Sequence, residues 1–210
     1  MAIVLVNGDV TGVVHPVKTW GELLDLLDTQ RAVSEDVVTG VRLDGVDTPA
    51  FRSPEIRARE LSADAEVFVE TARPSDLILD TLEEAETAAG TIVQAALCLG
   101  GSFRGKDVAG ANLALTEFGE SLGSLVVVTS AVAQAAGVGM AALGDGRTSA
   151  VEMINNLIGH AETLLNAQKA NDWSRVADVI EYDIAGTVRR WPLVLKGIRQ
   201  AAPRLVKTAA

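Results

Sequence analysis

The sequence predicts an α+β protein in which a sheet-forming domain over residues 1–73 precedes a four-helix bundle over residues 74–210. Before Pro74, short β-rich runs alternate with turn residues, whereas after it Ala and Leu dominate long stretches with helical spacing. Apolar residues make up 48% of the 210 residues and charged residues 22%, which is the balance of a folded chain rather than a disordered one.

The N-terminal half begins with an apolar run over residues 3–6 that predicts a buried strand. Asn7-Gly8 then predicts a hairpin turn, because both residues tolerate positive φ, and residues 10–17 form the returning strand. Thr19-Trp20-Gly21-Glu22 predicts a capping box, followed by a helix with Leu23, Leu24 and Leu27 on one side. Two more strands are expected over residues 36–43, ending at Asp44-Gly45, and over residues 65–71.

This order of hairpin, helix, strand, irregular crossing and strand resembles the ubiquitin-like β-grasp fold. The resemblance covers residues 1–72 and rests on element order, on the turn Leu43-Asp44-Gly45 and on the lead Arg59-Glu60-Leu61-Ser62 into the last strand. It implies a helix packed across a mixed sheet. A ubiquitin-like modifier needs Gly-Gly after that strand, where this chain has Glu70-Thr71-Ala72-Arg73-Pro74, so conjugation is not implied. A ferredoxin-like topology competes, but it requires a helix where Pro49 and Pro54 stand.

Four helices are expected in the C-terminal half. The first covers about residues 75–99 and ends at the C-cap signal Gly100-Gly101, and the second covers about residues 108–136. The third begins at the capping box Ser149-Ala150-Val151-Glu152, and the fourth covers about residues 171–199 with a kink or break at Pro192. Two apolar stripes are expected to face the core: Val151, Ile154, Ile158, Ala161, Leu165 and Gln168 in the third helix, and Val176, Ile180, Ile184, Val188, Trp191, Leu195 and Ile198 in the fourth.

Two stretches of these helices carry no charge, residues 87–103 and residues 121–144. The second is long enough to cross a bilayer, for which about 20 residues suffice, but most of its positions are Ala, Gly, Ser or Thr. Small residues let helices approach closely, so we favour the centre of the bundle over membrane insertion and keep membrane association as an alternative. Cys98 lies among Ala and Leu, which predicts an inert core thiol.

Two groups of residues are candidate binding sites. Trp173, Asp178, Glu181 and Tyr182 fall within one helical segment and form a candidate partner-binding face, because Trp and Tyr contribute strongly to protein interfaces. Ser102, Arg104 and Lys106 precede the second helix of the bundle and form a candidate anion-binding site, because a helix N-terminus favours negative charge. The alternative interpretation of each group is structural: a solvated helix face and an interhelical loop.

No catalytic residues, cofactor or metal ligands are predicted. His15 and His160 lie in different halves, and neither has the carboxylate or cysteine spacing of a metal site. The net charge of −10 argues against nucleic acid as a partner, and the single cysteine and the absence of a signal peptide favour a reducing, cytoplasmic setting.

The residues therefore favour a non-enzymatic interaction protein, an adaptor or chaperone with a protein partner or a second copy of itself. Its small, acidic, helical character is similar to that of bacterial flagellar and secretion chaperones. A small-molecule or anion-binding protein or enzyme that uses the Gly-rich loop 100–106 is the main alternative, and a membrane-associated protein is the other.

Overall fold

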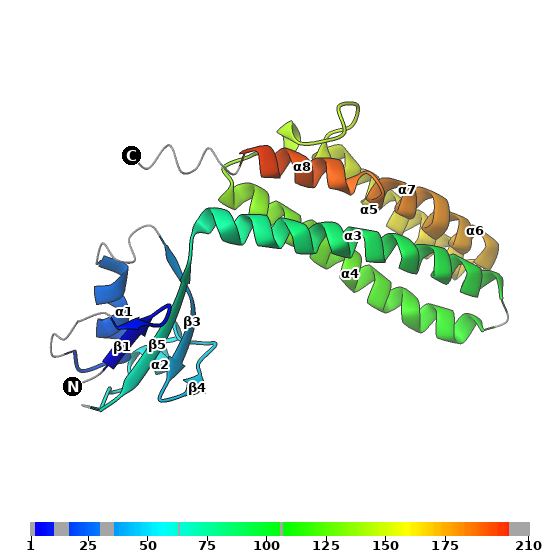
Figure 1. Cartoon of the computed structure of the whole chain (residues 1–210). Helices are drawn as coiled ribbons and strands as arrows, with labels where there is room; N and C mark the ends of the chain where they lie inside the picture. Colours follow the sequence, from blue (N-terminus) through cyan, green and yellow to red (C-terminus); the bar gives the residue numbers. More distant parts are fainter. Residues whose placement is uncertain (1–2, 11–16, 30–35, 63, 106, 202–210) are drawn as a thin grey trace. The chain divides into compact units, whose positions relative to one another are not determined.

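The computed structural model describes residues 3–10, 17–29, 36–62, 64–105 and 107–201, which form two compact units, residues 1–77 and residues 78–210. The protein is mixed α+β: the sheet lies in the first unit and long helices make up the second (Figure 1). Each unit has its own apolar core.

The first unit contains one sheet with strand order β2-β1-β5-β3-β4. Its strands are β1 (Ile3–Val6), β2 (Asp9–Val10), β3 (Val37–Leu43), β4 (Val46–Asp47) and β5 (Glu66–Ala72). β1 and β5 are parallel neighbours at the centre, and the other pairs are antiparallel. The predicted hairpin turn is confirmed, since Asn7 and Gly8 have φ of 50° and 88°. The returning strand was predicted over residues 10–17, and residues 11–16 lie outside the described part of the chain.

Helix α1 (Trp20–Thr29) covers the buried face of this sheet. Leu23, Leu24 and Leu27 are buried as predicted, and they pack with valines of β1, β3 and β5. The buried Trp20 ring donates from Nε1 to the Phe51 carbonyl oxygen at 2.6 Å, which ties α1 to the crossing between β4 and the short helix α2 (Pro54–Arg57). The Thr19 hydroxyl accepts from the Glu22 amide, while the Glu22 carboxylate accepts from the Lys18 amide, one residue earlier than the predicted box requires.

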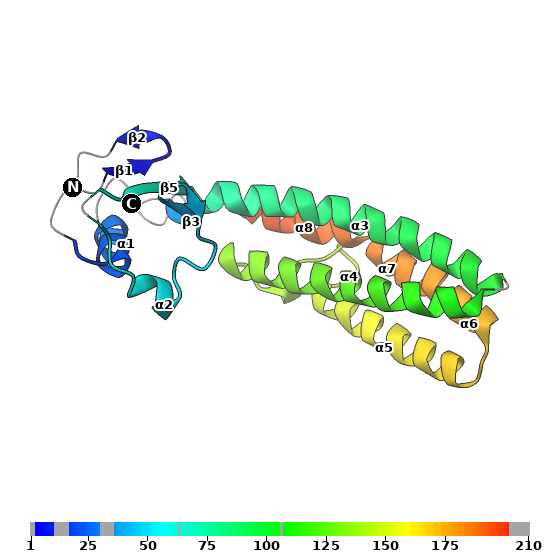
Figure 2. The same ribbon diagram turned by 90° about the horizontal axis from the view of Figure 1, so that it is seen from below.

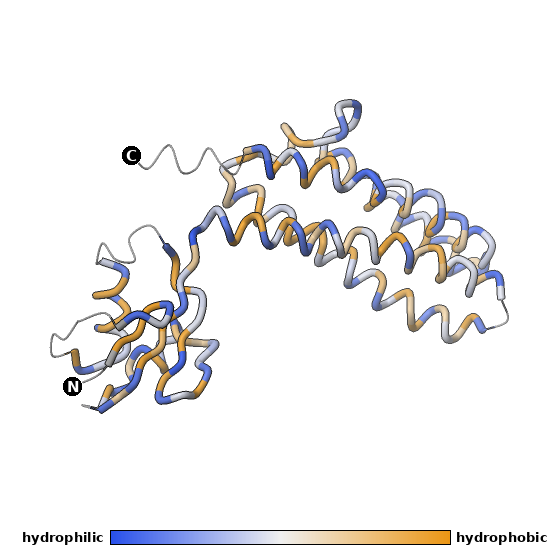
Figure 3. Tube along the Cα trace, in the orientation of Figure 1, coloured by the Kyte–Doolittle hydropathy of each residue, from blue (hydrophilic) through white to orange (hydrophobic). Residues whose placement is uncertain are grey.

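Over its described residues, the second unit has four helical limbs: α3 (Pro74–Arg104), α4 (Val108–Ala135), α5 (Ala150–Lys169) and a broken limb. The broken limb consists of α6 (Trp173–Asp178), a π-helical segment η2 (Val179–Ile184), α7 (Ala185–Val188) and α8 (Trp191–Ala201). A 3-10 turn, η1 (Met140–Ala142), lies between α4 and α5. Figure 2 shows successive limbs running in opposite directions, with α4 between α3 and α5, and Figure 3 shows hydrophobic and hydrophilic residues alternating along them.

Several predicted features of these limbs are confirmed. The capping box at Ser149 is complete, because Ser149 and Glu152 each accept from the other's backbone amide. The bonds from Ser149 also lower the pKa of the Glu152 carboxyl. All seven stripe residues from Val176 to Ile198 are buried. The expected break near Pro192 occurs just before it, where the chain leaves α7 and restarts at Trp191.

Two predictions about these limbs are wrong. Gly100-Gly101 does not end the first long helix, which continues to Arg104. The stripe expected to bury the third helix is also misplaced: Val151, Ile158 and Leu165 are exposed by 40%, 55% and 53%, whereas Met153, Leu157 and Leu164 are buried. Both sets repeat at helical spacing, so periodicity alone does not distinguish the face that the neighbouring limbs cover.

A buried hydrogen bond joins α4 to α8. The Trp191 Nε1–H donates to the Thr129 hydroxyl at 2.9 Å, and that hydroxyl donates to the Leu125 carbonyl oxygen at 2.7 Å. Both side chains are fully buried. The hydroxyl therefore satisfies the indole within an apolar core, where an unpaired donor would be costly.

We predict that Thr129→Val destabilises the protein by about 1–3 kcal/mol, because the indole N–H loses its partner while burial and volume change little. Thermal unfolding followed by circular dichroism measures the loss. Thr116→Val on the same helix is the matched control, since its exposed hydroxyl bonds to its own helix at Asn112. An equal effect of both substitutions would contradict the prediction.

The loop between α4 and α5 is held by Asp145. Its carboxylate accepts from the amides of Arg147 and Thr148 at 2.9 Å and 2.7 Å and pairs with Arg190 Nη1 at 3.0 Å. The two amide bonds, followed by Arg190, lower the pKa of the Asp145 carboxyl below its ordinary range. A depressed carboxyl pKa stabilises the fold above the unfolded value and loses that contribution as the pH falls through the folded value.

We therefore expect Asp145→Asn to lower the melting temperature at pH 7, and the difference from the unmodified chain to shrink as the pH falls below about 4, the ordinary aspartate value. Melting curves between pH 3 and pH 7 test this. Glu162→Gln, an exposed carboxylate on α5, is the control for loss of a negative charge. A difference that stays constant over this range would disprove the linkage.

Candidate functional site

The structure brings the two predicted candidate sites together. Arg104, at the end of α3, donates from Nη2 to Asp178 at 2.7 Å and from Nη1 to Glu181 at 2.5 Å. These bonds, that to Glu181 first, raise the pKa of the Arg104 guanidinium further above its usual value. One residue of the predicted anion site thus pairs with two residues of the predicted partner face.

The remaining members of these groups are placed as follows. Ser102 donates to the Cys98 carbonyl oxygen within its own helix, and Lys106 lies outside the described residues. The N-terminus of α4 already holds a carboxylate, because Asp107 Oδ1 accepts from the Gly110 amide at 2.9 Å. Trp173 stacks on Phe103 with ring centroids 5.9 Å apart, and Tyr182 is 67% exposed.

Gly100 lies inside α3 at a close contact with the fourth limb, rather than at the end of the helix. It is buried, and a Cβ at this position would overlap the Glu181 side chain. Gly101, one residue later, is exposed and has open space around its Cα. A side chain at position 100 would therefore have to move Glu181, which is 12% exposed, so Gly100 serves close packing against η2 rather than a change in backbone direction.

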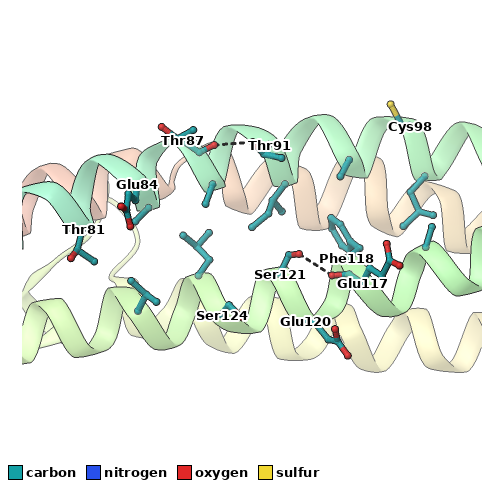
Figure 4. A pocket seen from close by; sticks show the side chains of 18 of the residues that line it. Thr81, Glu84, Thr87, Thr91, Cys98, Glu117, Phe118, Glu120, Ser121 and Ser124 are labelled. Carbon is teal, nitrogen blue, oxygen red and sulfur yellow. Dashed lines mark hydrogen bonds between the residues drawn. The ribbon is translucent and has the colours of Figure 1, made fainter. Parts of the chain in front are cut away.

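A groove between α3 and α4 was not predicted from the sequence. It has a volume of about 1440 Å³ and is lined by residues 80–102 of α3 and 114–128 of α4. Its base is apolar, formed by Ile92, Leu99, Phe118 and Leu125. Figure 4 shows Glu117 and Phe118 pointing from α4 toward α3, whereas Cys98 and Glu120 point away from the facing helix and mark the outer rims.

The prediction that Cys98 is buried is wrong, because Cys98 is exposed and belongs to this groove. On α3 it shares a face with Thr91 and Ser102, while Ala96 and Leu99 on the next face are buried. Both uncharged stretches contribute buried residues to the core of the second unit, as expected, but many of their small residues line the open groove instead.

The walls of the groove are built from small side chains that need no further partner. Thr87, Thr91, Ser102 and Ser121 each donate their hydroxyl to the carbonyl oxygen four residues earlier in their own helix. Ala88, Ala95 and Ala114 add only a methyl group each. The walls therefore present low, largely apolar surfaces, to which the backbone of another helix can come close.

The lining of the groove carries negative charge. Its lining includes five carboxylates and no basic residue; the five are Asp80, Glu83, Glu84, Glu117 and Glu120. In the part of the chain that the structure describes, none of them forms an ion pair. Over the same residues, Arg104 is the one cation of α3 and α4, and it faces Asp178 and Glu181 instead.

No protein-family model matches the chain, and neither a curated protein nor a solved structure shows significant similarity to it.

Among the described residues, no group of three His, Cys, Asp or Glu side chains is placed to hold a metal ion. In the same part of the chain, α4 is the one helix long and apolar enough to cross a membrane, and 22% of its most apolar 18-residue stretch is buried.

Gly100 and Gly101 form a matched pair for testing the contact between α3 and η2. We expect Gly101→Ala to stabilise the protein by up to about 1 kcal/mol, because Ala is the better helix former and the site is open. Gly100→Ala has the same gain in propensity but must displace Glu181 from Arg104, so its melting temperature should fall. Equal melting temperatures for the two variants would show that the close approach is unimportant.

Proposed function

We propose that this chain is a non-enzymatic interaction protein, an adaptor or chaperone that holds a segment of a partner protein in the groove between α3 and α4. The observation that supports this most directly is a groove of about 1440 Å³ with an apolar base, left open between two long helices of the chain. A groove with an apolar base between two long helices can accept the apolar face of a helix from another chain.

The architecture agrees with this proposal. We propose that the first unit is a ubiquitin-like β-grasp domain, supported by the strand order β2-β1-β5-β3-β4, the parallel central pair and the helix that covers one face. We propose that the second unit is a four-helix bundle whose fourth limb is broken. Both architectures commonly present binding faces, although fold alone does not determine function.

The alternatives receive less support from the geometry. Arg104 of the Gly-rich loop 100–106 is paired with two carboxylates, and Asp107 already caps the helix that follows, so an anion would have to displace them. Membrane association through residues 87–103 and 121–144 is favoured by the length and composition of α4, but the groove brings two glutamates of that helix, Glu117 and Glu120, to its surface. The proposed setting remains cytoplasmic, without nucleic acid, metal or cofactor.

A photoreactive residue placed at Ser121 tests the proposed function. Ser121 is exposed and lines the groove, so irradiation of living source cells should join the chain to a discrete partner protein, identified by mass spectrometry. Glu162, exposed on α5 away from the groove, is the control position and should give no such product. Adding Ala95→Trp, which fills the groove, should abolish the Ser121 product.

Three outcomes would count against the proposal. Equal products from both positions would indicate random encounters, and the absence of any product from Ser121 would indicate that the groove holds no protein partner in the cell. If the Ser121 product contained only crosslinked dimers of this chain, the groove would bind a second copy of the chain and not a different protein.

A further inference from the structure

We propose that the partner segment is a cationic amphipathic helix: its contact face carries small and apolar residues, and its flanks carry lysine or arginine. This proposal rests on the proposed function of the groove and adds the chemistry of the occupant. Three features of the groove support it: its charge, walls whose backbone groups are already hydrogen-bonded along the helix, and its length.

The charge of the groove determines the charge expected of the partner segment. Five carboxylates line the groove, and no described cation of the chain pairs with any of them. By contrast, Glu86, a carboxylate of α3 outside the groove, is paired: Arg199 of α8 lies 3.4 Å from it. Lysines and arginines along both flanks of an incoming helix would face these carboxylates and speed its association.

The groove also favours a helical occupant over an extended one. Both walls are long helices whose backbone groups are already hydrogen-bonded along the helix, so they offer no ladder of donors and acceptors to an extended peptide. A helix satisfies its own backbone and needs only a complementary surface. The small walls, with hydroxyls turned back onto their own carbonyl oxygens, provide that surface.

The length of the groove sets the length of the occupant. Its α3 wall extends from Asp80 to Ser102, which corresponds to about 33 Å at 1.5 Å per residue, and its α4 wall extends from Ala114 to Val128, about 21 Å. A helix of about 15–20 residues would therefore span both walls. Helices of this length that rest on Ala, Ser and Thr can approach to about 8–10 Å between axes.

A second copy of this chain fits the groove less well. The chain carries a net charge of −10, and residues 75–146, which include both groove walls, hold nine acidic and two basic residues. Two such surfaces repel each other. The last nine residues, 202–210, contain two basic residues, Arg204 and Lys207. The test must therefore distinguish a partner helix in the groove from this segment of the chain itself.

The test uses a fluorescent 20-residue peptide with Ala and Leu on one helical face and Lys on both flanks, and a twin peptide with Glu at every Lys position. We expect the Lys peptide to bind the full chain in fluorescence anisotropy, and the Glu peptide not to bind. Ala95→Trp, which fills the groove without changing charge, should weaken binding by at least ~10-fold. The double variant Glu84→Lys, Glu117→Lys should weaken it by a similar factor, and added salt should weaken binding to the unmodified chain.

Matched substitutions on α5 keep the test specific to the groove. Ala161→Trp and Glu162→Lys introduce the same side chains at exposed positions outside it and should leave the affinity unchanged. The single native cysteine gives a second measurement, because a helix in the groove should slow alkylation of Cys98 on its rim. Circular dichroism of each variant confirms that it is folded.

Several results would overturn the proposal. Equal binding of both peptides would remove the charge argument, and unchanged binding to the Ala95→Trp variant would place the peptide elsewhere on an acidic surface. Binding that appears only after residues 202–210 are deleted would assign the groove to the chain's own terminus. If Ser121 captures a partner protein in cells while the Lys peptide fails to bind, the adaptor function stands and the cationic helix does not.

Discussion

The close approach of α3 to the broken fourth limb at Gly100 determines which side chains of α3 are already paired within the helical unit. Without a side chain there, Glu181 fits against the α3 backbone and meets Arg104 together with Asp178. Trp173 stacks on Phe103 at the same end. These contacts use the cation of α3 and the apolar residues on one of its faces, and they leave the face toward α4 lined by small side chains and open.

The sequence was sufficient for the features that depend on local signals. Asn7-Gly8 specified a hairpin turn, Ser149 and Glu152 specified a helix start, and the stripe from Val176 to Ile198 specified a buried face. Features that depend on tertiary contacts were not predictable in this way. Nothing local reveals that Glu181 lies against Gly100, and α5 carries apolar residues at helical spacing on two faces, of which packing selects one.

The π-helical segment η2 does have a sequence signal. The stripe of the fourth limb advances by four residues three times in succession, from Val176 through Ile180 and Ile184 to Val188. In an α-helix each such step turns the face by about 40°, so three steps would carry the stripe about 120° away from the core. The wider turn of a π-helix, with i→i+5 hydrogen bonds, absorbs this rotation and keeps all four residues buried.

The exposed thiol on the rim of the groove affects how the purified protein behaves in air. Cys98 is the single cysteine of the chain, so any disulfide that it forms on oxidation in air must join it to another molecule. A disulfide between two chains at this position would set one rim against another and hinder access to the space between α3 and α4. Purified samples therefore need a reductant throughout, and a dimer that disappears on reduction is one joined through Cys98.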